Sequence, residues 1–353
     1  MALPTLTRTL DDDFVNTWYE IRADVIDNVL NATIFWAALN NFGSLVPQVG
    51  GEYITRTIGV GEKSTQRFSK GATLSQSVTN LDSMARWDWR YFLIDVNRTL
   101  IDDAKNSGPF KIKDYLTRRL MAARDGLVTD LETYVSQWGA YYTGDAQPNG
   151  LYDICPQGTA ESAVGSGAAS DSQASGTSNG NVNRTNDYWK NWYSSDGGSA
   201  ADSTKIAGET VEPYALNLVA DLRHIYNKVN AQQEPPNFIL MDQDIYESYE
   251  DEVLDKLQVV RNGFTRTAQD LGFEALTFKG ATMSYSSKLA SSLHVFLLNM
   301  NHVEMPYHPD VWFDATNWKG TSNQLETVMY IVCMTPGLIT AQPRRHGCME
   351  YAS

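Results

Sequence analysis

A long amphipathic stripe in the middle of the chain limits the fold more than any other feature. It follows Gly108-Pro109, and its apolar residues are separated by steps of three and four positions. The residues of this stripe are Ile112, Leu116, Leu120, Ala123, Leu127, Leu131, Tyr134 and Trp138. The spacing is close to the 3.6-residue period and predicts one amphipathic helix, roughly 40 Å long at 1.5 Å per residue. Because such a helix is longer than a small compact domain needs, we expect it to form a spine of the molecule.

A second segment, residues 50–80, contains too little apolar surface to bury itself. Gly50-Gly51 opens a run rich in β-branched residues, Tyr53–Ile58, and glycines and polar residues follow. The pattern predicts a long two-stranded hairpin with a polar tip. The positively charged residues of this segment are Arg56, Lys63, Arg67 and Lys70. Since an isolated hairpin is barely stable in water, we expect the segment to lie on another surface.

The remaining elements alternate between helices and strands. The acidic triplet Asp11–Asp13 precedes an apolar helical pattern that runs toward Asn41 and stops near Gly43. Further helices are expected at 214–229 and 244–258, and strands at 87–96, 238–241, 276–278, 295–298 and 328–334. This mixed order predicts an α+β fold with mostly antiparallel sheets. Between these elements, Gln157–Gly180 is dominated by small and polar residues, which predicts a mobile surface loop.

Composition narrows the class of protein. The 353 residues suggest about two domains, and 42% hydrophobic with 20% charged residues supports a packed interior. The net charge of −14 disfavours sequence-specific binding of nucleic acid. The three cysteines are far apart, which argues against a disulfide framework and fits a reducing compartment. The sequence shows no signal peptide and no apolar run of membrane-spanning length, so we expect a soluble protein made inside the cell.

The sequence contains no motif that specifies an enzyme, a cofactor site or a metal site. The run Gly59–Ser64 resembles a phosphate-binding loop but has Thr57 and Glu62 where that loop requires glycine. Gly176–Gly180 matches the spacing of a nucleophile elbow, yet it lies in low-complexity sequence rather than between a strand and a helix. The five histidines show no metal-binding spacing. We therefore expect no catalytic residues, no cofactor and no metal.

Several motifs, in order along the chain, resemble those of tailed-bacteriophage major capsid proteins of the Hong Kong 97 type. Residues 50–54, Gly-Gly-Glu-Tyr-Ile, resemble the start of the family's extension loop, and 148–151, Pro-Asn-Gly-Leu, resemble the entry to its axial domain. Residues 183–191 and 271–281 are similar to two further family stretches, with Asn183 in place of the usual Asp. The resemblance covers nearly the whole chain. It is interrupted at 157–180, which is longer than the family's usual connection.

The resemblance implies the Hong Kong 97-like capsid fold, an α+β fold in five parts. These are an N-terminal arm (1–49), an extension loop (50–80), a peripheral domain with the spine helix (81–147), an axial domain (148–325) with the disordered-like loop 157–180, and a C-terminal strand region (326–353) that returns to the peripheral domain. It also implies a structural, non-enzymatic protein that self-assembles into hexamers and pentamers of an icosahedral shell around double-stranded DNA. The extension-loop cations Arg56, Lys63, Arg67 and Lys70 would then contact the acidic surface of a neighbouring subunit.

The resemblance further implies partners besides the chain itself. These are a separate scaffolding protein, a portal, and a maturation protease or a decoration protein. The packaged DNA would be enclosed without sequence specificity, no membrane would be involved, and the protein would reside in the virion capsid after assembly in the host cytoplasm. Two alternatives are compatible with the sequence: an encapsulin-type protein nanocompartment of the same fold, and a hydrolase or carbohydrate-binding module whose aromatic residues line a groove.

Overall fold

The computed structural model describes residues 34–59, 67, 69–71, 81–99, 115–136, 148–155, 162–164, 180, 182, 189, 191–195, 218–230, 234–254, 276–289, 293–320 and 326–350. The helices are α2 (Ile34–Asn41), α4 (Tyr115–Ser136), α5 (Leu151–Ile154), α6 (Leu218–Asn230) and α7 (Gln243–Leu254). The strands are β1 (Leu45–Pro47), β2 (Tyr53–Gly59), β3 (Asp82–Asp88), β4 (Tyr91–Thr99), β5 (Ser162–Val164), β6 (Asn191–Ser195), β7 (Phe238–Met241), β8 (Thr277–Phe278), β9 (Ala281–Tyr285), β10 (His294–Leu298), β11 (Val303–Tyr307), β12 (Asp314–Ala315), β13 (Lys319–Gly320), β14 (Glu326–Met334), β15 (Ile339–Thr340) and β16 (Gly347–Glu350).

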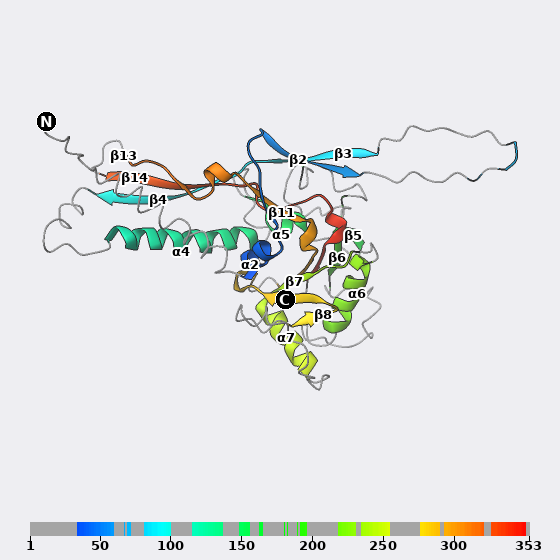
Figure 1. Ribbon diagram of the computed structural model, residues 1–353. Helices are drawn as coiled ribbons and strands as arrows, with labels where there is room; N and C mark the ends of the chain where they lie inside the picture. The colour runs from blue at the N-terminus through cyan, green and yellow to red at the C-terminus, as the bar shows by residue number, and fades with distance from the viewer. Residues whose placement is uncertain are drawn as a thin grey trace, which may run out of the picture.

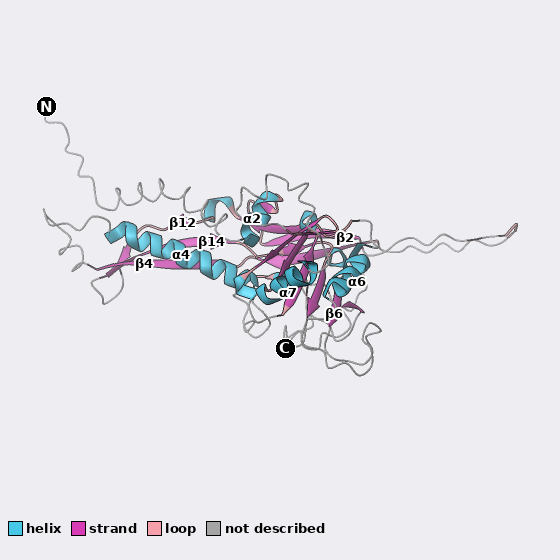
Figure 2. Ribbon diagram, turned by 90° about the horizontal axis from the view of Figure 1, so that it is seen from below, coloured by secondary structure: helices cyan, strands magenta, loops and turns pink. Residues whose placement is uncertain are grey.

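The described elements form an elongated molecule around a central body (Figure 1, Figure 2). In the body, a seven-stranded sheet has the order β5-β6-β16-β10-β7-β9-β8, and a three-stranded sheet joins β1, β11 and β15. A layer made of α4 and the four strands β4, β12, β13 and β14 extends to one side, and the hairpin β2–β3 points the opposite way. Most strand pairs are antiparallel, whereas β1–β11, β6–β16 and β7–β9 are parallel. The α+β class expected from the sequence is confirmed.

The seven-stranded sheet is buried on both faces because its central strands present apolar side chains in both directions. On β10, Val295 and Leu297 pack with α6 and α7, while Phe296 and Leu298 belong to the main core on the other face. Such a strand reads in the sequence as a continuous apolar run rather than an alternating one. The two helices and the layer therefore lie on opposite faces of the same sheet.

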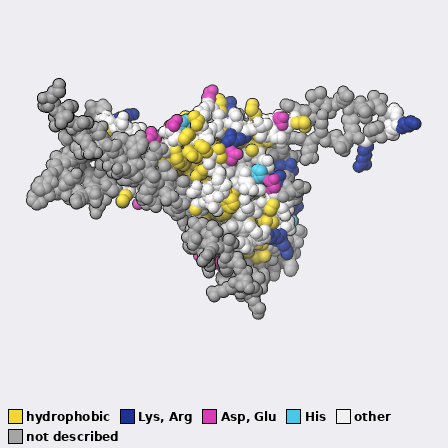
Figure 3. Space-filling view, in the orientation of Figure 1, with side chains coloured by type: hydrophobic (Ala, Val, Ile, Leu, Met, Phe, Trp, Pro, Cys, Tyr) yellow, Lys and Arg dark blue, Asp and Glu magenta, His cyan; other side chains and the backbone are white. Residues whose placement is uncertain are grey.

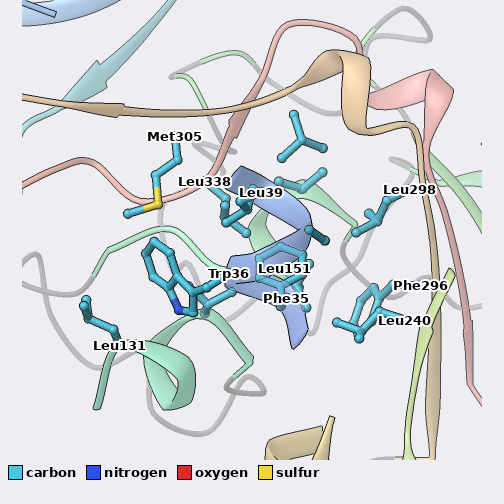
Figure 4. Close-up of a cluster of buried hydrophobic side chains, with 14 of the residues drawn as sticks. Phe35, Trp36, Leu39, Leu131, Leu151, Leu240, Phe296, Leu298, Met305 and Leu338 are labelled. Atoms are coloured by element: carbon cyan, nitrogen blue, oxygen red, sulfur yellow. The ribbon is translucent and has the colours of Figure 1, made fainter. Parts of the chain in front are cut away.

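Helix α2 fills the centre of the main core. Its Phe35, Trp36 and Leu39 point toward apolar side chains from α4, α5 and the seven-stranded sheet (Figure 4). The helix ends where the sequence predicts, since Gly43 has φ +68° and the N–H of Ser44 donates to the carbonyl oxygen of Leu39 at 2.9 Å. This is a Schellman termination, in which glycine adopts the left-handed conformation at no steric cost. The part of that predicted helix before α2 lies outside the described residues.

The predicted spine helix is confirmed as α4. Its 22 residues span about 33 Å at the usual helical rise. Leu127 and Leu131 from the predicted stripe are buried in the main core together with residues of β4 and β14, and Tyr134 stacks on Phe92 of β4 with ring centroids 5.6 Å apart. The two ends of the stripe lie outside the described residues.

The single strand expected at 87–96 is wrong, because the chain passes from one sheet to another within it. Two residues separate β3, in the hairpin, from β4, in the layer. Trp87 and Trp89 are buried in the cluster between the hairpin and the body, whereas Tyr91 and Leu93 are each 65% exposed. Before the break the odd-numbered residues face inward. After it the even-numbered residues of β4 face inward and pack on α4. One alternating pattern in the sequence therefore covers two strands with different partners.

Two passages of the chain between the layer and the body cross at Asn149 and Gly337. The N–H of Asn149 donates to the carbonyl oxygen of Pro336 at 2.9 Å, and the N–H of Leu338 donates to the carbonyl oxygen of Asn149 at 2.8 Å. Gly337 has φ +89°, and a Cβ placed on it would lie 2.3 Å from the Asn149 oxygen. Only glycine permits this approach of two backbones.

The region 326–353 was expected to return to the peripheral domain, and its described part, 326–350, divides among three sheets. β14 pairs with β4 along its length, β15 joins β11, and β16 enters the seven-stranded sheet between β6 and β10. The hairpin also extends further than the expected boundary at residue 80, because β3 ends at Asp88. Of the predicted mobile loop 157–180, three residues form β5 at the edge of the sheet, and most of the rest lies outside the described residues.

Candidate interaction surfaces

The hairpin β2–β3 is anchored to the body by one apolar face. Its strands pair from Tyr53–Asp88 at the base to Gly59–Asp82 toward the tip. The buried side chains of this face are Ile54, Ile58, Ala85 and Trp87, which pack with Trp89, Val182, Trp189 and Ile339. The prediction that residues 50–80 cannot bury themselves is therefore corrected for the base of the hairpin, where strand alternation collects the few apolar side chains on one face.

The tip of the hairpin carries exposed positive charge. The described tip residues, 67 and 69–71, lie far from the body at the end of the projection (Figure 1). Arg67 and Lys70 are exposed, and dark blue Lys and Arg side chains are visible along the outer part of the projection in Figure 3. Neither forms an ion pair with any other residue that the structure describes. On the outward face nearer the base, Met84 is 68% exposed.

The four cations predicted to contact a neighbour occupy different environments. Arg56 turns back to the body, where its Nε and Nη2 lie 2.9 and 2.7 Å from Oε2 of Glu304 on β11. Arg67 and Lys70 are at the tip, and Lys63 lies outside the described residues. A contact of these residues with another subunit stays a prediction. The Arg56 pair was beyond sequence reasoning, since its partner is 248 positions away.

An open cleft of about 320 Å³ lies in the layer between α4 and β4. It is lined by Tyr91, Phe92, Leu93, Ile94, Leu127, Asp130, Leu131, Tyr134, Pro148, Ile331 and Cys333. Strand β4 pairs with β14 on one side, and its other side has no partner among the described strands. Tyr91 and Leu93 expose most of their apolar surface. Asp130, which lines the cleft, is exposed, and so is Asp95, the next residue of β4 after the lining residue Ile94. A free strand edge beside an apolar cleft can accept an extended segment of another chain.

The described residues show no arrangement suited to catalysis or metal binding. Within that part of the chain, no group of three or more His, Cys, Asp or Glu side chains could hold a metal ion. None of the helices described is both long and apolar enough to cross a membrane. His346 is a structural residue: burial lowers its pKa to about 3, so its ring is neutral. Its Nδ1 accepts the N–H of Asn299 at 3.2 Å, and its Nε2 lies 3.1 Å from Oγ1 of Thr340.

Comparison with solved structures identifies the class of fold. No protein-family model matches the sequence, and no curated protein matches it. Solved structures match nearly the whole chain, and they establish the Hong Kong 97-like capsid fold that the sequence motifs predicted.

Three solved structures illustrate the likeness. The chain is similar to a subunit of the cyanophage A-1(L) capsid, with 13% identity over 89% of this chain and 92% of that chain and a TM-score of 0.60. It is also similar to the capsid of Myoviridae phage XM1, with 9% identity over 88% and 90% of the two chains and a TM-score of 0.54. The encapsulin of a complex from Synechococcus elongatus matches with 11% identity over 87% and 84% and a TM-score of 0.50. At these identities the likeness concerns the fold.

Proposed function

We propose that the chain is a major capsid subunit that self-assembles into hexamers and pentamers of an icosahedral shell enclosing double-stranded DNA. The observation that carries this proposal is the hairpin, whose charged tip stands away from a body with a capsid fold (Figure 1). The base of the hairpin is covered by the body, but the described residues of its tip lie away from it, and we expect another copy to cover them because an isolated hairpin is barely stable in water. The role is mechanical and involves no catalysis.

The hairpin of one copy would reach the layer of the next. Its cations Lys63, Arg67 and Lys70 would meet the negative side chains of Asp95 and Asp130 beside the cleft. Each exposed ion pair contributes under about 1 kcal/mol, so these charges orient the contact. Most of the stabilisation would come from burying the exposed apolar side chains of β4 and pairing its free edge. Because tip and cleft are different surfaces, the contact is heterologous and can close into a ring.

We also propose the division of the chain into arm (1–49), extension loop (50–80, continued by β3), peripheral domain (81–147), axial domain (148–325) and a C-terminal region (326–353) shared between the two domains. A scaffolding protein, a portal, and a maturation protease or decoration protein would take part in assembly, which would occur in the host cytoplasm and end in the virion. The matching encapsulin shows that the same fold also serves a protein compartment. DNA protected from nuclease inside purified shells would favour the capsid, and shells holding only protein would favour the compartment.

Removing the projecting part of the hairpin tests the proposal. Gly59 and Asp82 face each other across the hairpin, so 60–81 can be replaced by an Asn-Gly turn that keeps β2 and β3 paired. We expect a folded protein that elutes as a monomer in size-exclusion chromatography and forms no shells in electron microscopy, under conditions in which the full chain assembles.

A matched variant, Arg67→Glu with Lys70→Glu, keeps the length of the hairpin and reverses its charge. It should assemble less than the full chain at low salt, and approach it at high salt where charges are screened. Normal shells from the shortened chain would refute the role of the hairpin. A full chain that never assembles would refute the capsid function itself.

A further inference from the structure

The outer surface of the body is formed by two helices that lie side by side. Helices α6 and α7 pack on the same face of the seven-stranded sheet, where their apolar side chains form one cluster with Ile239, Met241, Val295 and Leu297. The two helices also touch each other. Their outward faces are therefore adjacent parts of a single surface.

One flank of this surface is positive. It consists of Arg223 and Lys228 on α6 and Lys279 in the β8–β9 turn, all of them exposed. The turn is held on α6, because Nζ of Lys279 donates to Oδ1 of Asn227 at 2.6 Å and the hydroxyl of Tyr226 donates to the Lys279 carbonyl oxygen at 3.1 Å. None of the three cations forms an ion pair with a described carboxylate. Dark blue side chains mark this flank over α6 in Figure 3.

The other flank is negative. The sequence of α7 contains Asp244, Glu247, Glu250, Asp251 and Glu252 and no lysine or arginine. Asp244 and Glu247 are exposed, and neither forms an ion pair with a described cation. Like charges gathered on one helix repel one another, and a positive surface from outside would relieve this repulsion. We call Arg223, Lys228 and Lys279 the positive flank, and Asp244 and Glu247 the negative flank.

We propose that the positive flank of one copy contacts the negative flank of the next copy in a head-to-tail ring, an inference that rests on the proposed function as a self-assembling subunit. The partner is a second copy because one chain carries both complementary surfaces, and within the described residues neither flank forms an ion pair. Two different surfaces in contact make a heterologous interface, which closes into a ring when repeated around an axis. Exposed charges at such an interface fix its register and make its strength depend on salt.

Double-stranded DNA is the competing partner for the positive flank. The negative flank lies on α7, which contacts α6 on the same face of the seven-stranded sheet. The whole chain has a net charge of −14. Phosphates that approached the positive flank would meet both sources of repulsion. A second copy meets the same repulsion, but its negative flank brings two described carboxylates instead of the dense row of phosphates along a duplex. The charge distribution therefore favours a second copy.

Charge reversal of each flank, and of both together, tests the contact in the full chain. One variant carries Arg223→Glu and Lys228→Glu, a second carries Asp244→Lys and Glu247→Lys, and a third carries all four substitutions. Each of the first two places like charges across every contact, so we expect about tenfold less assembled protein at low salt and partial recovery at high salt. The third restores opposite charges and should assemble within about twofold of the original chain. Size-exclusion chromatography and electron microscopy measure assembly, and circular dichroism with thermal unfolding verifies folding.

A mixture of the first two variants gives an independent readout. When they alternate around a ring, every contact again joins opposite charges, but only a ring with an even number of subunits can alternate fully. We expect the mixture to form hexamers and to lack the five-membered rings that close a shell. A simple loss of folding in either variant would not produce this difference between even and odd rings.

Three results would overturn the proposal. One is normal assembly of either single-flank variant at low salt. Another is a four-substitution variant that is folded and still as defective as the other two. The third is normal assembly of the variant with a reversed positive flank together with loss of nuclease-protected DNA, which would assign that flank to DNA. Failure of the unsubstituted chain to assemble would instead overturn the proposed function, and this contact with it.

Discussion

Substitution of Gly337 by alanine should strongly destabilise the subunit, because the two chain passages cross there without room for a side chain. The added Cβ would lie 2.3 Å from the oxygen and 2.5 Å from the nitrogen of Asn149, and 2.9 Å from Cβ of Pro148. Two of these atoms belong to the backbone, so no side-chain rotation relieves the overlap. The passages must separate.

The expected loss has two sources. A residue with a Cβ in the left-handed conformation, which Gly337 adopts at φ +89°, costs about 1–2 kcal/mol. Separation of the passages also breaks the hydrogen bonds from Asn149 to Pro336 and from Leu338 to Asn149, and each buried group left unpaired costs roughly 1–3 kcal/mol. With one group left unpaired for each broken hydrogen bond, these effects together predict a loss of about 3–8 kcal/mol, which is a large part of the stability of an ordinary domain.

Gly280→Ala provides the matched control. Gly280 has φ +91°, and a Cβ placed on it would meet no atom within 4 Å. It should therefore lose only the conformational part, about 1–2 kcal/mol. Urea unfolding of both variants under conditions that prevent assembly, followed by circular dichroism, gives the two free energies of unfolding. If Gly337→Ala destabilises the protein no more than Gly280→Ala, the crossing does not constrain the fold as described.

Two further predictions concern pH. Burial raises the pKa of Glu132 on α4, whose carboxylate accepts a hydrogen bond from Ser286, so its contribution to stability is present at low pH and is lost as pH rises through that raised pKa. Glu132→Gln should raise the free energy of unfolding at neutral pH and remove this dependence, and an unchanged urea midpoint would contradict it. Burial lowers the pKa of His346 to about 3, so its contribution to stability is lost as pH falls from about 6.5 toward 3, by up to about 1.4 kcal/mol per pH unit. The difference in unfolding free energy between the original chain and His346→Asn should therefore vary with pH over this interval, and a constant difference would count against a buried neutral ring.

Local patterns in the sequence were enough to predict several elements. The spine helix α4 could be predicted because its apolar residues recur at helical spacing. Strand β14 could be predicted because it contains a continuous run of mostly apolar residues, which indicates a buried strand. The end of α2 was equally local, since Gly43 supplies the conformation that terminates a helix. The overall fold followed from a resemblance spread along the chain, and the structure comparisons confirm it.

Features that depend on distant residues could not be predicted. The cleft beside β4 arises from α4, β4 and β14 together, and the only local signal was that Tyr91 and Leu93 alternate with equally apolar neighbours. Such a run does not indicate which side chains face solvent. Arg56 pairs with Glu304, and β16 inserts between β6 and β10. Both contacts join residues far apart in the sequence, and local periodicity contains no information about such contacts.

The position of β16 imposes an order on biosynthesis. This strand is among the last described residues of the chain, yet it lies inside the seven-stranded sheet, with β6 on one side and β10 on the other. Until this strand has been synthesised, the edges of β6 and β10 that it joins remain unpaired, and such edges favour aggregation. The sheet can be completed only after Glu350 has emerged from the ribosome. A polypeptide truncated before β16 would therefore have an incomplete body with two open strand edges, and the body can be completed only after nearly all of the described chain has been made.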